Sequence, residues 1–190
     1  MTIRTLHAMP WIGEDPVLDL ANTVVHGAGP ERGDIDLLSD PQLLASWRDR
    51  AADRRLAGLP LADLVALRDL VRYALDAAAE EKPLPDSVRT RLNALAAAAP
   101  VIFLVDADGR LAQRETDGPA DAAVARQALT LAAGPDQARL RRCNAPSCGM
   151  FFLARRRDQA WCSLGCGNRA RSARRQPQPP RTVKPPRDRR

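Results

Sequence analysis

Hydrophobic positions in the first part of the chain recur at helical spacing. Apolar residues follow Asp15-Pro16 and again Asp40-Pro41 at intervals of three and four. Each Asp-Pro pair combines an N-cap side chain with a proline suited to the first helical position. These patterns predict one helix from Pro16 to about Val25 and a second from Pro41 past Trp47.

Three longer helices and a hairpin are predicted next. The same periodicity predicts helices over about 61–80, 86–99 and 119–133, the last stopped by Gly134. An apolar run over 101–106, an Asp-Gly turn signal and residues 111–115 predict a β-hairpin between them. A two-stranded ribbon is marginally stable alone, so we expect it to pack on the helices. The predicted class is α+β and mostly helical.

Composition and charge divide the chain into an acidic body and a basic arm. Apolar residues make up 45% and aromatic residues 4%, which favours a helical core of Leu, Val and Ala. Residues 1–140 hold 15 Lys/Arg against 21 Asp/Glu (net −6), and residues 141–190 hold 14 against 2 (net +12). Such an arm suits a polyanionic partner, although a basic terminus can also serve solubility alone. Residues 176–190, rich in proline and arginine, are expected to be a disordered basic tail.

The chain is expected to be cytoplasmic and not to bind a membrane. No stretch approaches the ~18 consecutive apolar residues of a membrane span, and the first residues do not form a signal peptide. In a reducing compartment, the cysteines suggest a metal site more than disulfides.

All four cysteines, Cys143, Cys148, Cys162 and Cys166, form two close pairs. Two knuckle-spaced pairs can hold one zinc ion in a tetrahedron; the alternatives are two disulfides or unrelated thiols. With no other ligand candidate nearby, the predicted site is one structural Zn²⁺. We expect a strand at 150–153 and a turn near Arg157-Asp158 that returns the chain to Cys162 as a β-hairpin, with Arg155, Arg156 and Arg157 at its tip. A helix is expected over 163–175. This describes a treble-clef-like finger over 139–175, appended to a body over 1–138, with Phe151, Phe152 and Trp161 as its small core.

Arginines surround the predicted finger and make it a candidate for binding nucleic acid, since the guanidinium fork suits phosphate. The alternatives are a solvated basic surface and a finger that binds protein. The candidate contacts are Arg155, Arg156, Arg157, Asn168, Arg169, Arg171, Arg174 and Arg175.

The body offers one polar cluster, Asp19, Asn22 and His26, which a helix would place on one face. These residues are candidates for lining a ligand pocket. The alternative is structural, with Asp19 and Asn22 satisfying backbone groups and His26 at the helix end. No nucleophile–base pair or phosphate loop accompanies them, so the chain is not predicted to be an enzyme.

Two motifs resemble a known family. Cys166-Gly167-Asn168-Arg169, preceded by Trp161-Cys162-Ser163, is similar to the CGNR zinc finger of bacterial proteins. In those proteins the finger follows an ABATE domain, and Leu18-Asp19-Leu20-Ala21-Asn22-Thr23-Val24 and Asp36-Leu37-Leu38 resemble that domain. The resemblance implies four cysteine zinc ligands, DNA binding and stress-induced transcription regulation.

We therefore predict a zinc-containing DNA-binding transcriptional regulator. Its finger contacts DNA, and its N-terminal domain senses a small-molecule effector or forms a homodimer. The alternative is a structural zinc finger that mediates protein–protein interaction.

Overall fold

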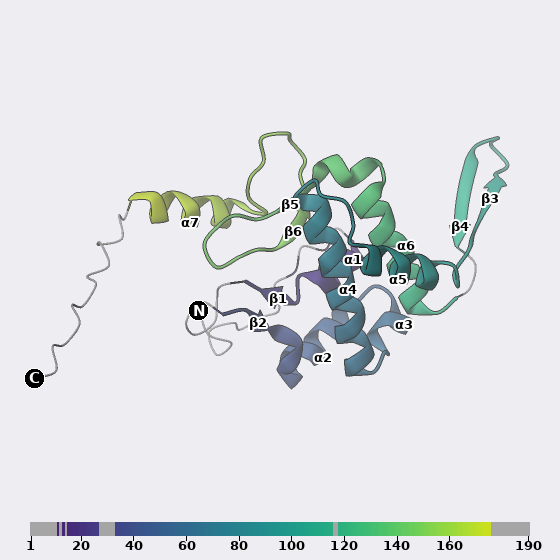
Figure 1. Ribbon diagram of the computed structural model, residues 1–190, viewed down its shortest axis with the longest axis horizontal. Coiled ribbons are helices and arrows are strands. Elements are labelled where there is room, and N and C mark those ends of the chain that lie inside the picture. The colour runs from purple at the N-terminus through teal and green to yellow at the C-terminus, as the bar shows by residue number, and fades with distance from the viewer. Residues whose placement is uncertain (1–10, 12, 14, 27–32, 116–117, 176–190) are drawn as a thin grey trace, which may run out of the picture.

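The structure is a computed structural model that describes residues 11, 13, 15–26, 33–115 and 118–175 (Figure 1). The predicted disordered tail, 176–190, lies outside the described residues. The elements are α1 (Pro16–Ala21), β1 (Val24–Val25), β2 (Ile35–Asp36), the 3-10 helix η3 (Leu37–Ser39), α2 (Pro41–Arg50), α3 (Arg54–Ala57), α4 (Leu61–Ala79), α5 (Asp86–Ala96), β3 (Val101–Val105), β4 (Leu111–Glu115), α6 (Ala120–Ala133), the 3-10 helix η4 (Pro135–Arg139), β5 (Leu140–Arg142), β6 (Phe151–Leu153) and α7 (Leu164–Arg175).

Helix α4 is the centre of the body and contacts α1, α5, α6 and β5. Its inward face carries Leu64, Leu67, Val71 and Leu75, all buried, as the helical period requires. Helix α6 presents mainly alanine to α4 and α5, which allows the helices to approach closely. The long helices and the mostly helical α+β class are confirmed.

Both predicted Asp-Pro helix starts are confirmed. Asp15 Oδ1 accepts hydrogen bonds from the backbone N–H of Val17 (2.7 Å) and Leu18 (3.4 Å). Asp40 Oδ1 accepts from Gln42 (2.8 Å) and Leu43 in the same way. The other carboxylate oxygen of Asp15 accepts from Gln127 Nε2 of α6 at 2.7 Å, so this cap also ties α1 to the helix behind it.

The first helix is shorter than predicted. It ends at Ala21, and Val24–Val25 instead form β1, which pairs antiparallel with β2. The Thr23 hydroxyl donates to the carbonyl of Leu20 at 2.8 Å and closes the last turn. The following β-branched residues favour a strand, so the apolar period that continued past Ala21 belonged to a second element.

The hairpin β3–β4 is confirmed, with Phe103 opposite Gln113 at its middle. Gly109 adopts φ +76° in the turn, and Asp106 Oδ1 accepts from the backbone N–H of Asp108 and Arg110. The expectation that the ribbon packs on the helices is wrong. Its strands project from the body (Figure 1), and Phe103 is 64% exposed.

The finger's hairpin also differs from the prediction. Strand β6 does not pair with the residues before Cys162; it pairs with β5, which precedes the first cysteine. Strand β6 pairs with the strand that precedes it in the chain, because Leu140 of β5 and Phe151 of β6 both lie in the main core of the body. No helix among the described residues is long and apolar enough to cross a membrane.

Candidate metal centre

The four cysteine sulfurs meet at one point, all within 4.8 Å of one another. Cys162 Sγ lies 3.7 Å from Cys148 Sγ and 3.5 Å from Cys166 Sγ, and all four cysteines are free of disulfides. A tetrahedral zinc ion with Zn–S bonds of about 2.3 Å requires sulfurs about 3.8 Å apart. The cluster is therefore suited to one zinc ion held by four thiolates.

The first cysteine pair lies on the loop between β5 and β6. The backbone N–H of Cys143 donates to Met150 at 2.8 Å, and Gly149 donates back to Cys143 at 3.2 Å. Ser147 (φ +55°) and Gly149 (φ +67°) turn the chain so that Cys148 faces Cys143. A side chain at Gly149 would collide with the His26 imidazole of the body, since a Cβ there would lie 2.7 Å from that ring.

The second pair is positioned by the start of α7. Cys162 precedes the helix and Cys166 lies in its first turn. The Ser163 hydroxyl accepts from the backbone N–H of Cys166 at 3.2 Å, as an N-cap side chain does. The ligand-bearing helix and its Cys166 are thus where the sequence predicted them.

The cysteine thiols of the cluster shift one another's pKa values. Hydrogen bonds from Cys148 and Cys162 lower the pKa of the Cys143 thiol to about 2. Its thiolate in turn raises the pKa of Cys148 to about 12 through their hydrogen bond, and also raises the pKa of Cys162. Negative charges on neighbouring sulfurs repel one another. A zinc ion offsets this repulsion, because it binds thiolates and displaces their protons.

Two donors outside the ligand set stabilise negative charge on the sulfurs. Arg169 donates from its guanidinium to Cys166 Sγ at 3.1 Å, and the backbone N–H of Cys162 donates to Cys143 Sγ at 3.5 Å. Four thiolates on Zn²⁺ leave a formal charge of −2, so a guanidinium against one sulfur offsets part of it. The sequence predicts Arg169 only as a nucleic-acid contact.

The finger has a small core of its own around Phe152, together with Ala145, Met150, Ala154 and Ala170, and with Trp161 packed against it. Trp161 lies on Gly167, where an added Cβ would be 3.3 Å from the indole. The Arg171 guanidinium lies over the same indole, 5.8 Å from its centre, and donates to Asn168 Oδ1 at 2.6 Å. The prediction that Phe151 shares this core is wrong, since its ring belongs to the core of the body.

Residues 154–161 form a loop between β6 and Cys162, so Arg155–Arg157 do not lie at a hairpin tip as predicted. The Gln159 side chain organises the loop. Its Oε1 accepts from the backbone N–H of Arg155 at 2.9 Å, and its Nε2 donates to the carbonyl of Trp161 at 3.1 Å. Nothing in the residue pattern distinguished Gln159 beforehand.

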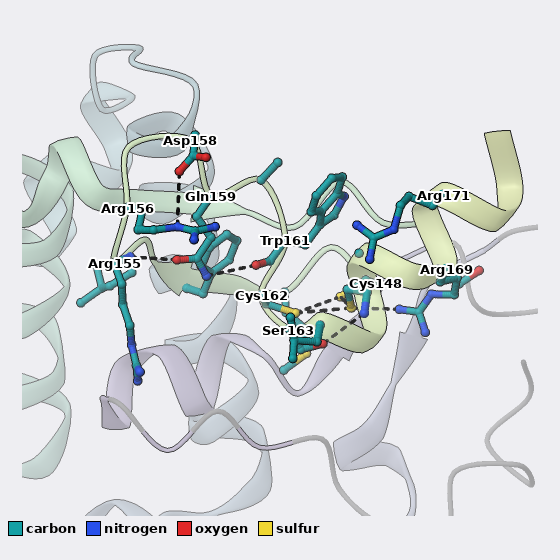
Figure 2. Close-up of a pocket in the computed structure, with 18 of the residues that line it drawn as sticks. Cys148, Arg155, Arg156, Asp158, Gln159, Trp161, Cys162, Ser163, Arg169 and Arg171 are labelled. Atoms are coloured by element: carbon teal, nitrogen blue, oxygen red, sulfur yellow. Dashed lines mark hydrogen bonds and ion pairs between the residues drawn. The ribbon is translucent and has the colours of Figure 1, made fainter.

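A cleft of about 970 Å³ separates this loop from α7. Figure 2 shows Arg155 and Arg156 on one side of the cleft and Arg169 and Arg171 on the other. Met150, Phe152 and Trp161 are among its apolar lining. All eight residues predicted to contact nucleic acid are exposed: Arg155, Arg156, Arg157, Asn168, Arg169, Arg171, Arg174 and Arg175.

The body residues Asp19, Asn22 and His26 do not share a helix face, because α1 ends before Asn22. Asp19 Oδ1 accepts from the backbone N–H of Gly13 at 2.9 Å. Asn22 is buried and binds the main chain of Phe151. His26 pairs with Asp34 at 2.8 Å and contacts Arg72, and it lines a separate hollow of about 300 Å³.

A mostly helical body with a closed four-cysteine metal centre defines a zinc-finger protein. A family model described as "ABATE: Putative stress-induced transcription regulator" matches residues 14–135, and one described as a CGNR zinc finger matches residues 139–177. The chain belongs to the ABATE family and carries a C-terminal CGNR zinc finger. No curated protein matches the chain. Neither family description names an enzymatic activity.

Proposed function

We propose that this protein is a zinc-containing, DNA-binding transcription regulator that works in the cytoplasm and catalyses no reaction. The metal centre orders the finger, and the arginines around it bind the phosphates of duplex DNA. The family descriptions support regulation of transcription in the stress response, and reduced thiolates suit a reducing compartment. The observation that carries the proposal is the distribution of charge around α7.

Helix α7 buries only a narrow face, formed by Cys166, Gly167 and Ala170. The rest of the helix is exposed, and its surface carries four arginines and no acidic residue. Over the whole finger, residues 139–175, there are ten arginines and a single carboxylate, Asp158, which is paired with Arg156 at 3.4 Å. A surface with such a surplus of guanidinium groups attracts phosphate at long range and releases counterions on binding.

Two sets of arginines in the finger differ in the contacts that their side chains make. Arg169 and Arg171 are engaged within the finger, with Cys166 and with Asn168 and Trp161. Among the residues that the structure describes, Arg157, Arg174 and Arg175 form no ion pair. We therefore assign phosphate contacts chiefly to Arg157 and to Arg174 and Arg175 at the end of α7, with Arg155 and Arg156 next to Arg157 on the same exposed loop. Exposed Asn168 is the proposed reader of a base edge, because a carboxamide can bind adenine in the major groove.

The test is a salt titration of duplex binding by the zinc-loaded full chain, followed by fluorescence anisotropy. Each phosphate contact contributes about 0.9 to the slope of log affinity against log salt. Replacing Arg174 and Arg175 with Ala, or Arg155, Arg156 and Arg157 with Ala, should lower the slope in proportion and weaken all duplexes alike. The matched control replaces Arg89 and Arg91, exposed on α5, and should change nothing.

The second candidate function is a structural finger that mediates protein–protein interaction, favoured by the apolar lining of the cleft. The two functions separate in the same experiment. Absence of duplex binding at low salt with zinc bound would exclude the DNA-binding proposal and leave the protein-binding one.

We also propose that the body senses a small-molecule effector. The hollow beside His26 supports this role, since Asp34, Arg72, Tyr73 and Asp76 also line it and could hold a small polar ligand. The backbone N–H of His26 donates to the carbonyl of Cys148 at 3.3 Å, which connects the hollow to the metal loop. A ligand screen that follows the NMR signals of the His26 ring tests the proposal, and the absence of any ligand that shifts them would count against it.

A further inference from the structure

The β3–β4 ribbon exposes apolar side chains on both of its faces. Phe103, Val105 and Leu111 are 64%, 70% and 71% exposed, and Ile102 and Leu104 are 37% and 41% exposed. The ribbon extends away from the helices at the opposite end of the molecule from the finger (Figure 1). Isolated two-stranded ribbons are marginally stable in water, and a sheet normally needs a third strand or a packed face.

The two edges of the ribbon are placed differently relative to the body. Strand β4 lies on the side of the body, and its last residue, Glu115, pairs with Arg126 of α6. Arg126 also donates to the carbonyl of Ala99, just before the ribbon begins. After β4, the carbonyl of Gly118 accepts a hydrogen bond from the guanidinium of Arg55 in α3 at 2.8 Å. The base of the ribbon is therefore held to the helices, and β3 forms the outer edge.

The outer edge lacks the features that normally protect a sheet edge. Strand β3 reads Val101-Ile102-Phe103-Leu104-Val105, with no charge, proline or glycine. Natural edge strands avoid unwanted pairing with lysine, proline, bulges or a covering element. Among the described residues β3 pairs with β4 alone, so its second row of backbone N–H and C=O groups is unpaired in the sheet.

We propose that β3 is a homodimer interface at which a second copy of this chain adds its own β3 antiparallel, forming a four-stranded sheet. In a two-fold antiparallel pair centred on Phe103, every residue of β3 lies opposite an apolar residue of the partner strand. Val101 then lies opposite the partner's Val105, and Phe103 lies opposite the partner's Phe103. An uncharged strand paired with itself sets no like charges against each other, whereas β4 carries Arg114 and Glu115.

The strand pair by itself covers less than the ~1,200 Å² of a standard interface, so the dimer should be weak and reversible. It does not rest on DNA binding, and it is tested without DNA. Two copies joined at β3 would carry two fingers at the outer ends of one particle. That arrangement fits a regulator, because one small finger offers few contacts for a specific site.

Sedimentation velocity on the zinc-loaded full chain, from roughly 1 to 200 µM, should show a monomer–dimer equilibrium. Phe103→Lys should weaken it roughly tenfold or more, since it places two cations on the two-fold axis. Leu61→Lys is the control, because Leu61 is an apolar residue exposed at 41%, as Leu104 is, but lies at the start of α4. Phe103→Thr keeps the strand preference and should also weaken the dimer, which covers a failure of the lysine variant to fold.

The register is checked by NMR on a mixture of isotope-labelled and unlabelled chains. Methyl contacts between Val101 of one chain and Val105 of the other are expected. A chain that stays monomeric over the whole range, or a dimer that neither Phe103 variant weakens, would overturn the proposal. A dimer weakened equally by Leu61→Lys would also overturn it.

Discussion

The carboxamide of Asn22 holds the main chain of Phe151 by two hydrogen bonds, from the backbone N–H to Oδ1 (2.7 Å) and from Nδ2 to the carbonyl (2.9 Å). Asn22 directly follows α1, and Phe151 begins β6, the strand that leaves the metal loop. Both residues are buried. The segment that resembles the opening of the ABATE domain is therefore the segment that fixes the body to the finger.

Replacing Asn22 with Ala should destabilise the fold by ~2–4 kcal/mol, because two buried backbone groups lose their partners. The measurement is urea unfolding of the zinc-loaded chain. Asn93→Ala is the control, since Asn93 is exposed on α5 and its loss should cost little. Equal effects of the two substitutions would contradict the role of the Asn22 pair.

Removing zinc should unfold the finger unevenly. Chelation takes away folding free energy on the order of 10 kcal/mol from the segments that depend on the metal, chiefly α7 and the 154–161 loop. Strands β5 and β6 should keep part of their protection, because Leu140 and Phe151 lie in the core of the body. Hydrogen exchange with and without a chelator measures this. Complete loss of protection in β5 and β6, together with α7, would show that these strands depend on the metal.

The intact chain should bind one zinc ion. Cys148→Ser should abolish tight binding, because a hydroxyl is a poor zinc ligand and three sulfurs leave the tetrahedron open. Zinc content after gel filtration, measured by mass spectrometry, is the readout. Ser172→Ala, an exposed change on α7, should retain one zinc per chain.

The two glycines at the start of α7 should respond differently to the same substitution. Gly167→Val should weaken the finger by ~1–3 kcal/mol, since a Cβ there already comes within 3.3 Å of Trp161 and its methyl groups must displace the ring. A Cβ at Gly165 has its nearest neighbour at 3.8 Å, so Gly165→Val should be tolerated. Zinc affinity from competition with a chelator, with Trp fluorescence as a second signal, distinguishes them.

Breaking a buried ion pair in the body should lower the free energy of unfolding more than breaking an exposed ion pair. Arg68 is 4% exposed and binds both carboxylate oxygens of Asp36, at 2.6 and 2.9 Å. Asp36→Ala should cost ~1–3 kcal/mol, because the buried guanidinium then keeps only its bond to Asp69 and the backbone N–H of Leu38 loses its cap, although Asp36 itself is partly hydrated. Asp86→Ala breaks an exposed pair with Arg89 and should cost less than about 1 kcal/mol. Thermal unfolding compares the two.

Local signals predicted those parts of the molecule that local chemistry determines. The Asp-Pro caps, the Asp-Gly turn and the cysteine spacings each act within a few residues, and the structure places all of them as expected. The apolar run into Val24 and Val25 fits a helix and a strand equally well, and the partner that decided it, β2, lies ten residues further on. Nor could the sequence assign Phe151 and Phe152 to different cores, since that depends on which residue reaches Asn22.

The loop that carries Cys143 and Cys148 joins β5 and β6. Both strands are packed into the body, so neither of them is a linker. Leu140 before the loop and Phe151 after it lie in the same hydrophobic core, so these two strands fix the orientation of the finger relative to the body. DNA held by α7 would be presented at a set angle to the acidic helices, whose repulsion of phosphate limits the directions of approach. Any shift of α1 or α4 would therefore change the tilt of α7 and of the DNA that it holds.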